Sequence, residues 1–467
     1  MTITTATSGV TAHGGRTRSW LAAAFSAIMV AALSICPNEA HAMKVQEVKS
    51  PGGINAWLVE SSTVPLVSMR FAFDGGGSTQ DPEGKEGVAN FLASMLDEGA
   101  GDLLAKPFQE RMEDLAMRMS FDDGRDAFYG SFETLNENRD EAAKLLALAV
   151  TKPRFDAEAI ERMRKQHLAG LAYAARDPQR VASEQWMAQV FAGHPYGRPA
   201  NGTAKTVAEI GRADLAAFHK RVFAKDNLRV VVVGDIDAAK LGKLLDDVFG
   251  ALPAKSTLAK VPDIEVKARE PLKVIDMNVP QSVARFGLPA MGRSDKDFMP
   301  AFVLNSILGG SSFTSRLYQE VREKRGLAYG VDTSIVPMRH TSMFYGGVAT
   351  KNEEVGQSLD VIRSEIKRLT AEGPTEKELA DIKAYLTGSF ALRFDSNAKI
   401  ANQLLWIWQE ELGIDYVDRR NGEIEAVTLE QVKRVARRLF ENKELIVTIV
   451  GKPKNLARPG ASSVPRG

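Results

Sequence analysis

Apolar residues form strand-like patterns at both ends of the first half of the chain. Residues 54–59 are a short, mainly apolar run, and residues 66–73 alternate apolar and polar positions. Residues 228–234 are a β-branched run typical of a strand buried on both faces. Between these strands, apolar residues recur at helical spacing over 88–96, 108–119, 139–150, 157–176 and 213–222. Because strands and helices are mixed without strict alternation, the pattern predicts an α+β fold.

Two groups of residues recur later in the chain at nearly equal intervals. The Arg-Val-Phe and Gly of 221–234 return as Arg-Leu-Phe and Gly in 438–451, an offset of 217 residues. The Val-Pro and Phe of 64–71 return in 279–286, an offset of 215 residues. Chance similarity of helix and strand patterns is the alternative. Matching offsets at both ends of a unit of about 200 residues favour an internal duplication.

The duplication divides the chain into a leader, two similar domains, a linker and a tail. Residues 253–271 carry several Pro and Lys residues, which is typical of a linker, and the last residues are small and polar. The predicted parts are a signal peptide at 1–42, a first domain at 43–255, a linker at 256–271, a second domain at 272–456 and a flexible tail at 457–467.

The first forty-two residues have the three parts of a secretory signal. Arg16 and Arg18 precede an uncharged apolar run over 20–35, and the small-residue site Ala40-His41-Ala42 follows. An uncleaved membrane anchor is less favoured because the run is shorter than a bilayer span of about 20 residues. A lipid anchor on Cys36 is less favoured because the bulky Ile35 precedes it. The sequence therefore predicts export to the periplasm, with no membrane attachment after cleavage.

The charge balance and cysteine content exclude several other classes of protein. The 467 residues include 60 Lys and Arg against 59 Asp and Glu, so the net charge is only +1. This balance offers no basic field for nucleic acid or for an anionic membrane surface, and neither is expected as a partner. The single Cys excludes an intrachain disulfide, and it excludes a zinc site built from several thiolates.

Two local motifs in the first half resemble a known enzyme family. The first runs from Gly75-Gly76-Gly77-Ser78 through Asp81-Pro82 to 87–96, and the second is His194-Pro195-Tyr196-Gly197 followed by Gly202. Together with the duplication, they resemble the insulinase/pitrilysin-like zinc metallopeptidases, which include the mitochondrial processing peptidase and bacterial heterodimeric members. The resemblance implies two homologous α+β domains, each a mixed or antiparallel sheet flanked by helices, which form a clam-like half.

The zinc-binding side chains of that family are missing from this chain. Active members carry His-x-x-Glu-His on the helix after the Asp-Pro, a spacing that places two imidazoles and a carboxylate on one helix face. The corresponding positions here are Asn90, Ala93 and Ser94, and the segment 166–171, where the family supplies a glutamate ligand, contains no acid. The four histidines of the mature chain, His167, His194, His219 and His340, are all more than five residues apart. No metal is therefore expected in this chain.

The second half keeps the residues that the family brings to the zinc site of its partner domain. The run from Arg322 to Tyr329 within 321–329 (Val-Arg-Glu-Lys-Arg-Gly-Leu-Ala-Tyr) matches the family's Arg and Tyr, seven positions apart, in type and spacing. The resemblance implies that the guanidinium donates to peptide carbonyls and the phenol to a developing oxyanion. Gly309 and Gly310 lie where the processing peptidase has a glycine-rich substrate loop. They are also consistent with a tight turn.

Two other kinds of catalysis are not supported by the motifs. Gly75-Gly76-Gly77 lacks the Gly-Lys-Ser/Thr ending of a phosphate-binding loop. Ser311 and Ser312 are not part of a Gly-x-Ser-x-Gly nucleophile motif. Neither nucleotide hydrolysis nor serine hydrolysis is therefore expected.

Three functions are compatible with this pattern. The favoured one is a non-catalytic subunit of a periplasmic heterodimeric zinc metallopeptidase that acts on peptides. In it, Arg322 and Tyr329 would complete the site of a homologous catalytic subunit carrying His-x-x-Glu-His and the zinc. The second is a catalytically inert scaffold or peptide-binding protein of the same fold. The third and weakest is an active zinc metalloendopeptidase with atypical ligands.

Overall fold

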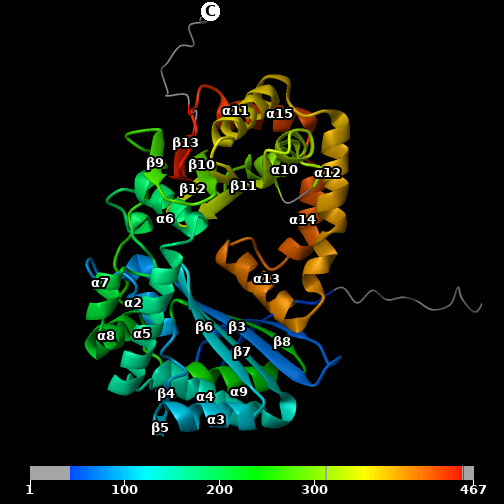
Figure 1. Cartoon of the computed structure of the whole chain (residues 1–467). Helices are drawn as coiled ribbons and strands as arrows, with labels where there is room; N and C mark the ends of the chain where they lie inside the picture. Colours follow the sequence, from blue (N-terminus) through cyan, green and yellow to red (C-terminus); the bar gives the residue numbers. More distant parts are fainter. Residues whose placement is uncertain (1–42, 311–312, 455, 457–467) are drawn as a thin grey trace, which may run out of the picture. The chain divides into compact units, whose positions relative to one another are not determined.

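The computed structural model describes residues 43–310, 313–454 and 456. The predicted signal peptide at 1–42, Ser311 and Ser312, and the predicted tail at 457–467 lie outside the described residues. From Val45 onward the described residues belong to one compact unit, which contains both large sheets (Figure 1).

The first half of the described chain mixes strands and helices as the apolar pattern predicts. Its elements are β1 (Gln46–Lys49), β2 (Asn55–Glu60), β3 (Leu66–Asp74), η1 (Ser78–Gln80), α2 (Val88–Ala93), β4 (Gly99–Ala100), β5 (Leu103–Leu104), α3 (Ala105–Asp114), β6 (Arg118–Asp123), β7 (Ala127–Leu135), η2 (Asn136–Asn138), α4 (Arg139–Thr151), α5 (Ala157–Ala174), α6 (Pro178–Val190), η3 (Pro195–Gly197), α7 (Ala204–Glu209), α8 (Arg212–Val222), β8 (Leu228–Gly234) and α9 (Ala238–Phe249).

The second half repeats the main features of this order. Its elements are β9 (Leu272–Asp276), β10 (Gln281–Pro289), α10 (Phe298–Leu308), the π-helix η4 (Tyr318–Glu323), β11 (Ala328–Met338), β12 (Thr341–Lys351), α11 (Val355–Glu372), α12 (Glu376–Gly388), η5 (Phe390–Phe394), α13 (Asn397–Gln409), α14 (Tyr416–Glu425), α15 (Leu429–Phe440) and β13 (Ile446–Gly451). Residues 253–271, which include the predicted linker, contain no helix or strand.

The two large sheets have the same topology, which is direct structural evidence for the duplication. The first sheet has the strand order β1-β2-β8-β3-β7-β6, and the second has β9-β13-β10-β12-β11. Apart from β1, each strand of the first sheet has a counterpart in the same position of the second. Each sheet also contains a single parallel pair, β2 with β8 and β9 with β13, among otherwise antiparallel neighbours. Mixed sheets flanked by helices confirm the predicted α+β class.

The recurring glycines occupy equivalent positions at the ends of β8 and β13. Gly234 has a φ of 152°, and Gly451 has a φ of 145°. A Cβ on Gly234 would lie 2.2 Å from the carbonyl oxygen of Leu66 on β3, and one on Gly451 would lie 2.5 Å from Ser282 Oγ on β10. The repeated Gly is therefore explained by the close approach of the neighbouring strand.

One sequence-predicted helix is wrong at its carboxyl end. The helical pattern over 108–119 predicts a single helix, but α3 ends at Asp114 and β6 begins at Arg118. Ala116 takes a positive φ of 46° between them, and β6 pairs antiparallel with β7. Pairing with a strand later in the sequence overrides the local helical spacing here, because sheet pairing satisfies a full row of backbone groups.

Each half of the chain contributes one helix to the sheet of the other half. Helix α6 packs on β10 and β13, and α13 packs on β3 and β8 (Figure 1). The two helices are both 13 residues long and stand 219 residues apart, so they are counterparts in the duplication. The fully buried Trp186 of α6 donates from Nε1 to the carbonyl oxygen of Ile446 on β13 at 2.9 Å. Because each of these helices packs on the sheet of the opposite half, the two halves are joined through apolar contacts.

Each half also has its own large apolar core. In the first half, β3 and β8 contribute fully buried residues such as Phe71 and Val230, packed with α4 and α9. In the second half, Phe286 of β10 and Phe344 of β12 pack with α10, α11 and α15. No helix in the described part of the chain has the length and apolar character needed to cross a bilayer.

Candidate functional site

Helix α2 carries the three positions at which the family resemblance places a zinc motif. Asn90 donates from Nδ2 to Asp123 Oδ1 at 2.7 Å, and Ser94, which caps the helix, lies with Oγ 2.9 Å from His167 Nε2. Ala93 is buried and offers no polar atom. The polar side chains at these positions are thus paired with other groups of the chain.

His167 of α5 contacts Ser94, the position at which active family members carry the second histidine of the zinc motif. Its ring stacks on Phe91, with centroids 4.9 Å apart and an interplanar angle of 12°. Ser94 donates its hydroxyl proton to the Phe91 carbonyl oxygen at 2.7 Å, so the tautomer that completes the pair has His167 Nε2–H donating to Ser94 Oγ. Burial lowers the pKa of His167, which keeps the imidazole neutral at pH 7. Because its proton is already used, Ser94 is not an activated nucleophile.

The carboxyl groups of the buried Asp81 and the half-buried Asp123 support α2. Asp81 accepts hydrogen bonds from the backbone N–H groups of Gly87 at 2.7 Å and Ala89 at 2.9 Å, which fixes the start of the helix. Burial raises the pKa of Asp81 to about 8 against the opposing effect of these bonds. Burial likewise raises the pKa of Asp123 to about 6, although the hydrogen bond from Asn90 opposes the rise. The helix is held in place by polar contacts that need no metal.

The residues at this position do not fit a zinc ion. Zinc prefers His nitrogen, thiolate or carboxylate ligands in a tetrahedral set. Of the three motif positions and the nearby His167, only His167 supplies such an atom. Within 43–310, 313–454 and 456, no three His, Cys, Asp or Glu side chains converge closely enough to hold a metal ion. The other three histidines lie elsewhere, and each has a ring nitrogen near an oxygen of the chain. The partners are Pro262 O for His194 at 2.9 Å, Val150 O for His219 at 2.9 Å and Asp263 Oδ1 for His340 at 3.1 Å.

The second candidate group comes from η4 and the start of β11. The Cζ atom of Arg322 lies 4.5 Å from the ring centroid of Tyr329 and 4.9 Å from that of Tyr318. The Arg322 side chain is 31% exposed, and Tyr329 is 85% exposed. Gly326 has a φ of 61°, and its left-handed backbone conformation ends the helical segment so that the chain turns back towards Tyr329. The sequence spacing of seven residues thus becomes a direct cation–π contact.

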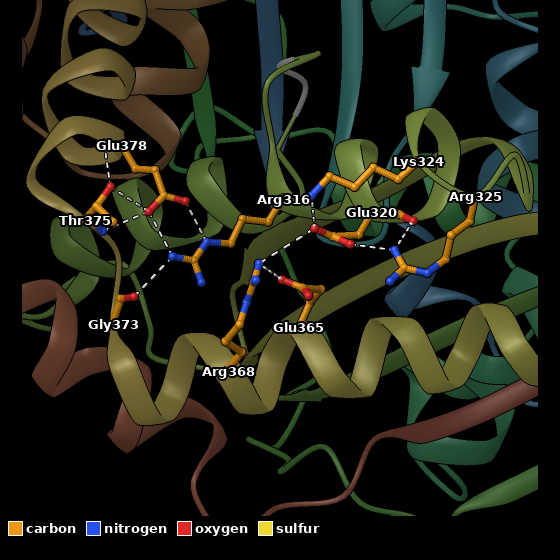
Figure 2. A network of polar contacts seen from close by, with 9 residues as sticks. All are labelled: Arg316, Glu320, Lys324, Arg325, Glu365, Arg368, Gly373, Thr375 and Glu378. Atoms are coloured by element: carbon orange, nitrogen blue, oxygen red, sulfur yellow. Dashed lines mark hydrogen bonds and ion pairs between the residues drawn. The ribbon is translucent and has the colours of Figure 1, made fainter.

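A polar network fixes the segment that carries Arg322, as Figure 2 shows. The side chain of Glu320 is 9% exposed and accepts from Lys324 Nζ at 2.6 Å and Arg325 Nη1 at 2.5 Å. Arg368 of α11 lies 3.9 Å from the same carboxylate and donates to Glu365 at 2.5 Å. These contacts tie η4 to α11.

A second part of the same network ties the residues just before η4 to the end of α11 and the start of α12. Arg316 makes a two-pronged contact with Glu378, at 2.6 and 2.8 Å, and donates to the carbonyl oxygen of Gly373 (Figure 2). Glu378 also accepts from the backbone N–H and hydroxyl of Thr375. Burial alone would raise the pKa of Glu378, but the Arg316 and Thr375 hydrogen bonds lower it to about 2, so the carboxylate is ionised at neutral pH.

Gly309 and Gly310 form a close turn at the end of α10. Their N–H groups both donate to the carbonyl oxygen of Asn305 at 2.9 Å, and Gly309 O accepts from the N–H of Thr333 on β11 at 2.8 Å. A Cβ on Gly309 would lie 2.5 Å from Thr333 Oγ1, and one on Gly310 would lie 2.7 Å from Ser306 Cα. Close packing accounts for both glycines, and a role in handling substrate stays a prediction.

The His-Pro-Tyr-Gly motif makes hydrogen bonds that connect separate segments of the chain. His194 is buried, with Nδ1 accepting from the N–H of Tyr196 and Nε2 lying 2.9 Å from the carbonyl oxygen of Pro262. The Tyr196 hydroxyl donates to the carboxylate of Asp126 at 2.7 to 2.8 Å and accepts from the N–H of His340 at 3.2 Å. The motif therefore holds 253–271 and the β11–β12 turn against the first half.

The structure gives two residues contacts at the candidate sites that the sequence analysis did not predict. His167 meets Ser94 across 73 residues, and it lies inside the segment 166–171 in which the resemblance places the third zinc ligand. The position of His167 within this segment is the sequence feature that could have predicted its contact with Ser94. Tyr318 reaches Arg322 at the i, i+4 spacing of a helix, so its contact was also accessible from sequence.

Comparison with known proteins agrees with this geometry. A family sequence model described as insulinase (peptidase family M16) matches residues 58–204, and one described as the peptidase M16 inactive domain matches residues 209–386. The crystal structure of a peptidase M16 inactive domain from Pseudomonas fluorescens superposes with a TM-score of 0.82 at 30% identity, covering 89% of this chain and all of that one. This chain belongs to the M16 peptidase family. The family resemblance and the fold of two M16-like domains are thereby confirmed.

Some relatives of this M16 chain are named as peptidases, and at least one is named as a non-peptidase. A protein of Helicobacter pylori named non-peptidase homolog YmxG is 27% identical over 396 residues, covering 85% of this chain and 91% of that protein. An uncharacterised zinc protease of Mycobacterium bovis is 25% identical over 412 residues, covering 86% of this chain and 92% of that protein. The M16 fold alone therefore does not decide whether a member is a peptidase, and the site residues must.

Proposed function

We propose that this M16 chain is the non-catalytic subunit of a heterodimeric zinc metallopeptidase of the periplasm. It contributes Arg322 and Tyr329 to the active site of a homologous partner. The partner carries His-x-x-Glu-His and the zinc, and the substrates are peptides. Export to the periplasm rests on the predicted signal peptide at 1–42.

The observation that carries the proposal is that the hydrogen-bond donors of the Arg322 guanidinium are unused among the described residues. Arg316, Arg325 and Arg368 are all committed to buried or half-buried carboxylates in the network of Figure 2. Among the described residues Arg322 makes no side-chain hydrogen bond, and its nearest carboxylate oxygen is that of Glu323, 3.7 Å from Nε. An arginine held against two aromatic rings with its donors unused is suited to bind an oxygen of an external ligand.

The chemistry of the pair suits peptide cleavage in a shared site. The guanidinium offers a planar set of N–H donors to peptide carbonyl oxygens, and the exposed Tyr329 phenol can donate to an oxyanion. In the first half of the chain, the motif positions on α2 provide no set of metal ligands. A subunit that has lost its own ligands but keeps these donors needs a partner that supplies the metal.

The proposal is tested by reconstitution. The chain is purified alone, the homologous chain with His-x-x-Glu-His is purified alone, and peptide cleavage is measured for each and for the mixture. We expect cleavage by the mixture and little by either chain. Undiminished activity of the partner alone would contradict the proposal.

The second candidate is an inert scaffold or peptide-binding protein. At α2, Asn90 pairs with Asp123, and Ser94 pairs with His167. These contacts favour the second candidate because they are what a helix kept only for its structural role would make. The double substitution Arg322→Ala with Tyr329→Phe separates the two candidates. Loss of cleavage in an intact complex rejects the scaffold, and unchanged cleavage supports it.

The third candidate, an active peptidase with atypical ligands, has no ligand set among the described residues to support it. Metal analysis of the purified chain tests it directly. Stoichiometric zinc on the chain alone would favour this candidate over the subunit proposal.

A further inference from the structure

We propose that Tyr318 is a positioning residue for Arg322. The two tyrosine rings at 318 and 329 together fix where the guanidinium points before any ligand arrives. The inference rests on the proposed function for its kinetic consequence, but its geometric part concerns this chain alone.

The two tyrosines reach Arg322 from different elements. Tyr318 is the first residue of η4 and lies four residues before Arg322, whereas Tyr329 lies on β11. Their ring centroids are 4.9 and 4.5 Å from Arg322 Cζ. Among the described residues no ring contact joins the two tyrosines to each other, so the guanidinium is the group that links them. Removing either ring leaves Arg322 with one aromatic contact.

The Tyr318 ring is itself supported from its outer side. Phe313 packs edge-on against it, with centroids 5.3 Å apart and an interplanar angle of 72°. Gln319, the next residue, donates from its side chain to the carbonyl oxygen of Phe313 at 2.9 Å. The aromatic side chain that meets Arg322 is thus held in place by the segment that precedes η4.

Ring contacts orient an arginine in a way that a carboxylate cannot. A carboxylate partner takes up the N–H donors of the guanidinium, as Glu378 does with Arg316 and Glu320 does with Arg325. An aromatic ring instead attracts the cation through its π face and accepts none of the strong hydrogen bonds. Tyr318 therefore restricts the rotamers of Arg322 while its donors stay available for an oxygen of the substrate.

The backbone beneath this pair is fixed separately. Lys324 N–H bonds to Gln319 O at 2.9 Å in the i→i+5 pattern of a π-helix, and the network around Glu320 anchors the same turn to α11. Wide helical turns of this kind are frequently found at functional sites. The network sets the position of the Arg322 backbone, and Tyr318 sets the direction of its side chain.

The test compares Tyr318→Leu, which removes the ring, with Tyr318→Phe, which keeps it. In the reconstituted complex we expect Tyr318→Leu to lower kcat by about 3- to 30-fold while KM changes by less than about twofold. Tyr318→Phe should retain kcat near that of the unsubstituted chain. Tyr173→Leu, at an 80% exposed tyrosine on α5, is the matched control and should change neither constant.

A second measurement needs neither the partner nor activity. In a chain labelled with ¹³C-arginine, the Arg322 Cδ protons are assigned by their absence in Arg322→Lys. Ring currents from both tyrosines should shift them upfield, and the shift should shrink in Tyr318→Leu but not in Tyr318→Phe. Unshifted protons that do not respond to Tyr318→Leu would overturn the inference.

The outcomes separate this inference from the function on which it rests. If Arg322→Ala leaves cleavage by the complex intact, the proposed function fails whatever Tyr318 does. If Arg322→Ala abolishes cleavage and Tyr318→Leu does not affect it, only the positioning role fails. Equal losses in Tyr318→Leu and Tyr318→Phe would assign the effect to the hydroxyl and also overturn the role of the ring.

Discussion

Trp57 of β2 and Trp408 of α13 stack face to face, with ring centroids 4.8 Å apart and an interplanar angle of 7°. They come from opposite halves of the duplicated chain. Arg229 on β8 reinforces the contact, since its Cζ lies 5.8 Å from the Trp408 ring and its Nη1 donates to the Trp408 carbonyl oxygen. Together with Trp186 on the other sheet, this stack is one of two reciprocal attachments that make the halves a single unit.

Trp408→Ala should therefore weaken the whole described unit. We expect a loss of about 2–4 kcal/mol in the free energy of unfolding, because a half-buried aromatic stack between the two halves is removed. Urea denaturation followed by far-UV circular dichroism measures it. Trp406→Ala is the control, since Trp406 is 39% exposed and its ring contact is to Tyr416 within the second half. Equal losses in both variants would contradict the attachment role of Trp408.

The geometry of α2 predicts that a zinc site can be rebuilt. The combined substitution Asn90→His, Ala93→Glu and Ser94→His places two imidazoles on one face of the helix, and His167 lies 2.9 Å from the present Ser94 Oγ. Three imidazoles and a water are a sufficient set for zinc. We expect one zinc per chain with a dissociation constant of about micromolar or tighter, measured by isothermal titration calorimetry.

The control for the rebuilt site adds His167→Ala to the same three substitutions. Loss of the third imidazole should weaken zinc binding by about tenfold or more. If the triple variant binds no zinc, α2 does not retain the orientation of the family's motif helix.

The half-buried carboxyl of Asp123 should give the protein a measurable pH dependence. Its pKa is about 6 in the folded chain, above the ordinary value of about 3.9 in an unfolded chain. The folded state then binds more protons between these values. The contribution of Asp123 to stability is fully present below about pH 4, is lost as the pH rises to about 6, and amounts to about 1–3 kcal/mol.

Asp123→Asn removes this titration and keeps a partner for Asn90. The difference in unfolding free energy between the two proteins, measured by urea denaturation from pH 4 to pH 7, should decline through the same window. A difference that stays constant across the window would show that Asp123 titrates normally.

The sequence predicts three strands of the first sheet and the duplication well because both depend on local pattern. Residues 66–73 and 228–234 become β3 and β8 almost to the residue, and the repeated Gly of 234 and 451 occupies equivalent sheet positions. The Arg322 and Tyr329 spacing also translates into a direct contact. These features rest on periodicity, spacing or a residue type that the backbone requires.

What the sequence misses depends on contacts between distant residues. The pairing of β6 with β7 ends α3 early, and the exchange of α6 and α13 between sheets has no local marker. The contact of Ser94 with His167 spans 73 residues, and each residue alone is unremarkable. The π-helical winding of η4 likewise has no local marker in the sequence.

Glu320→Gln should loosen the segment that presents Arg322. The substitution removes a negative charge whose cationic partners Lys324 and Arg325 are 61% and 41% exposed, so we expect about 1 kcal/mol lower unfolding free energy. Thermal and urea denaturation of the purified chain measure it. Asp381→Asn breaks an exposed i, i+4 pair with Lys377 and should cost less than about 0.5 kcal/mol. A Glu320→Gln chain as stable as the Asp381→Asn chain would contradict the anchoring role.

The most direct test of the account is kcat/KM for peptide cleavage by the reconstituted complex carrying Arg322→Ala in this chain. Arg363→Ala, at a surface arginine of α11 that pairs with Asp360, is the matched control. The account predicts that Arg322→Ala lowers kcat/KM by about 10²-fold without weakening assembly, because the charged hydrogen bonds from the guanidinium to the substrate's peptide carbonyl oxygens are lost. The Arg363→Ala complex should be unchanged. An assembled Arg322→Ala complex that cleaves peptides as fast as the Arg363→Ala complex would contradict the central claim.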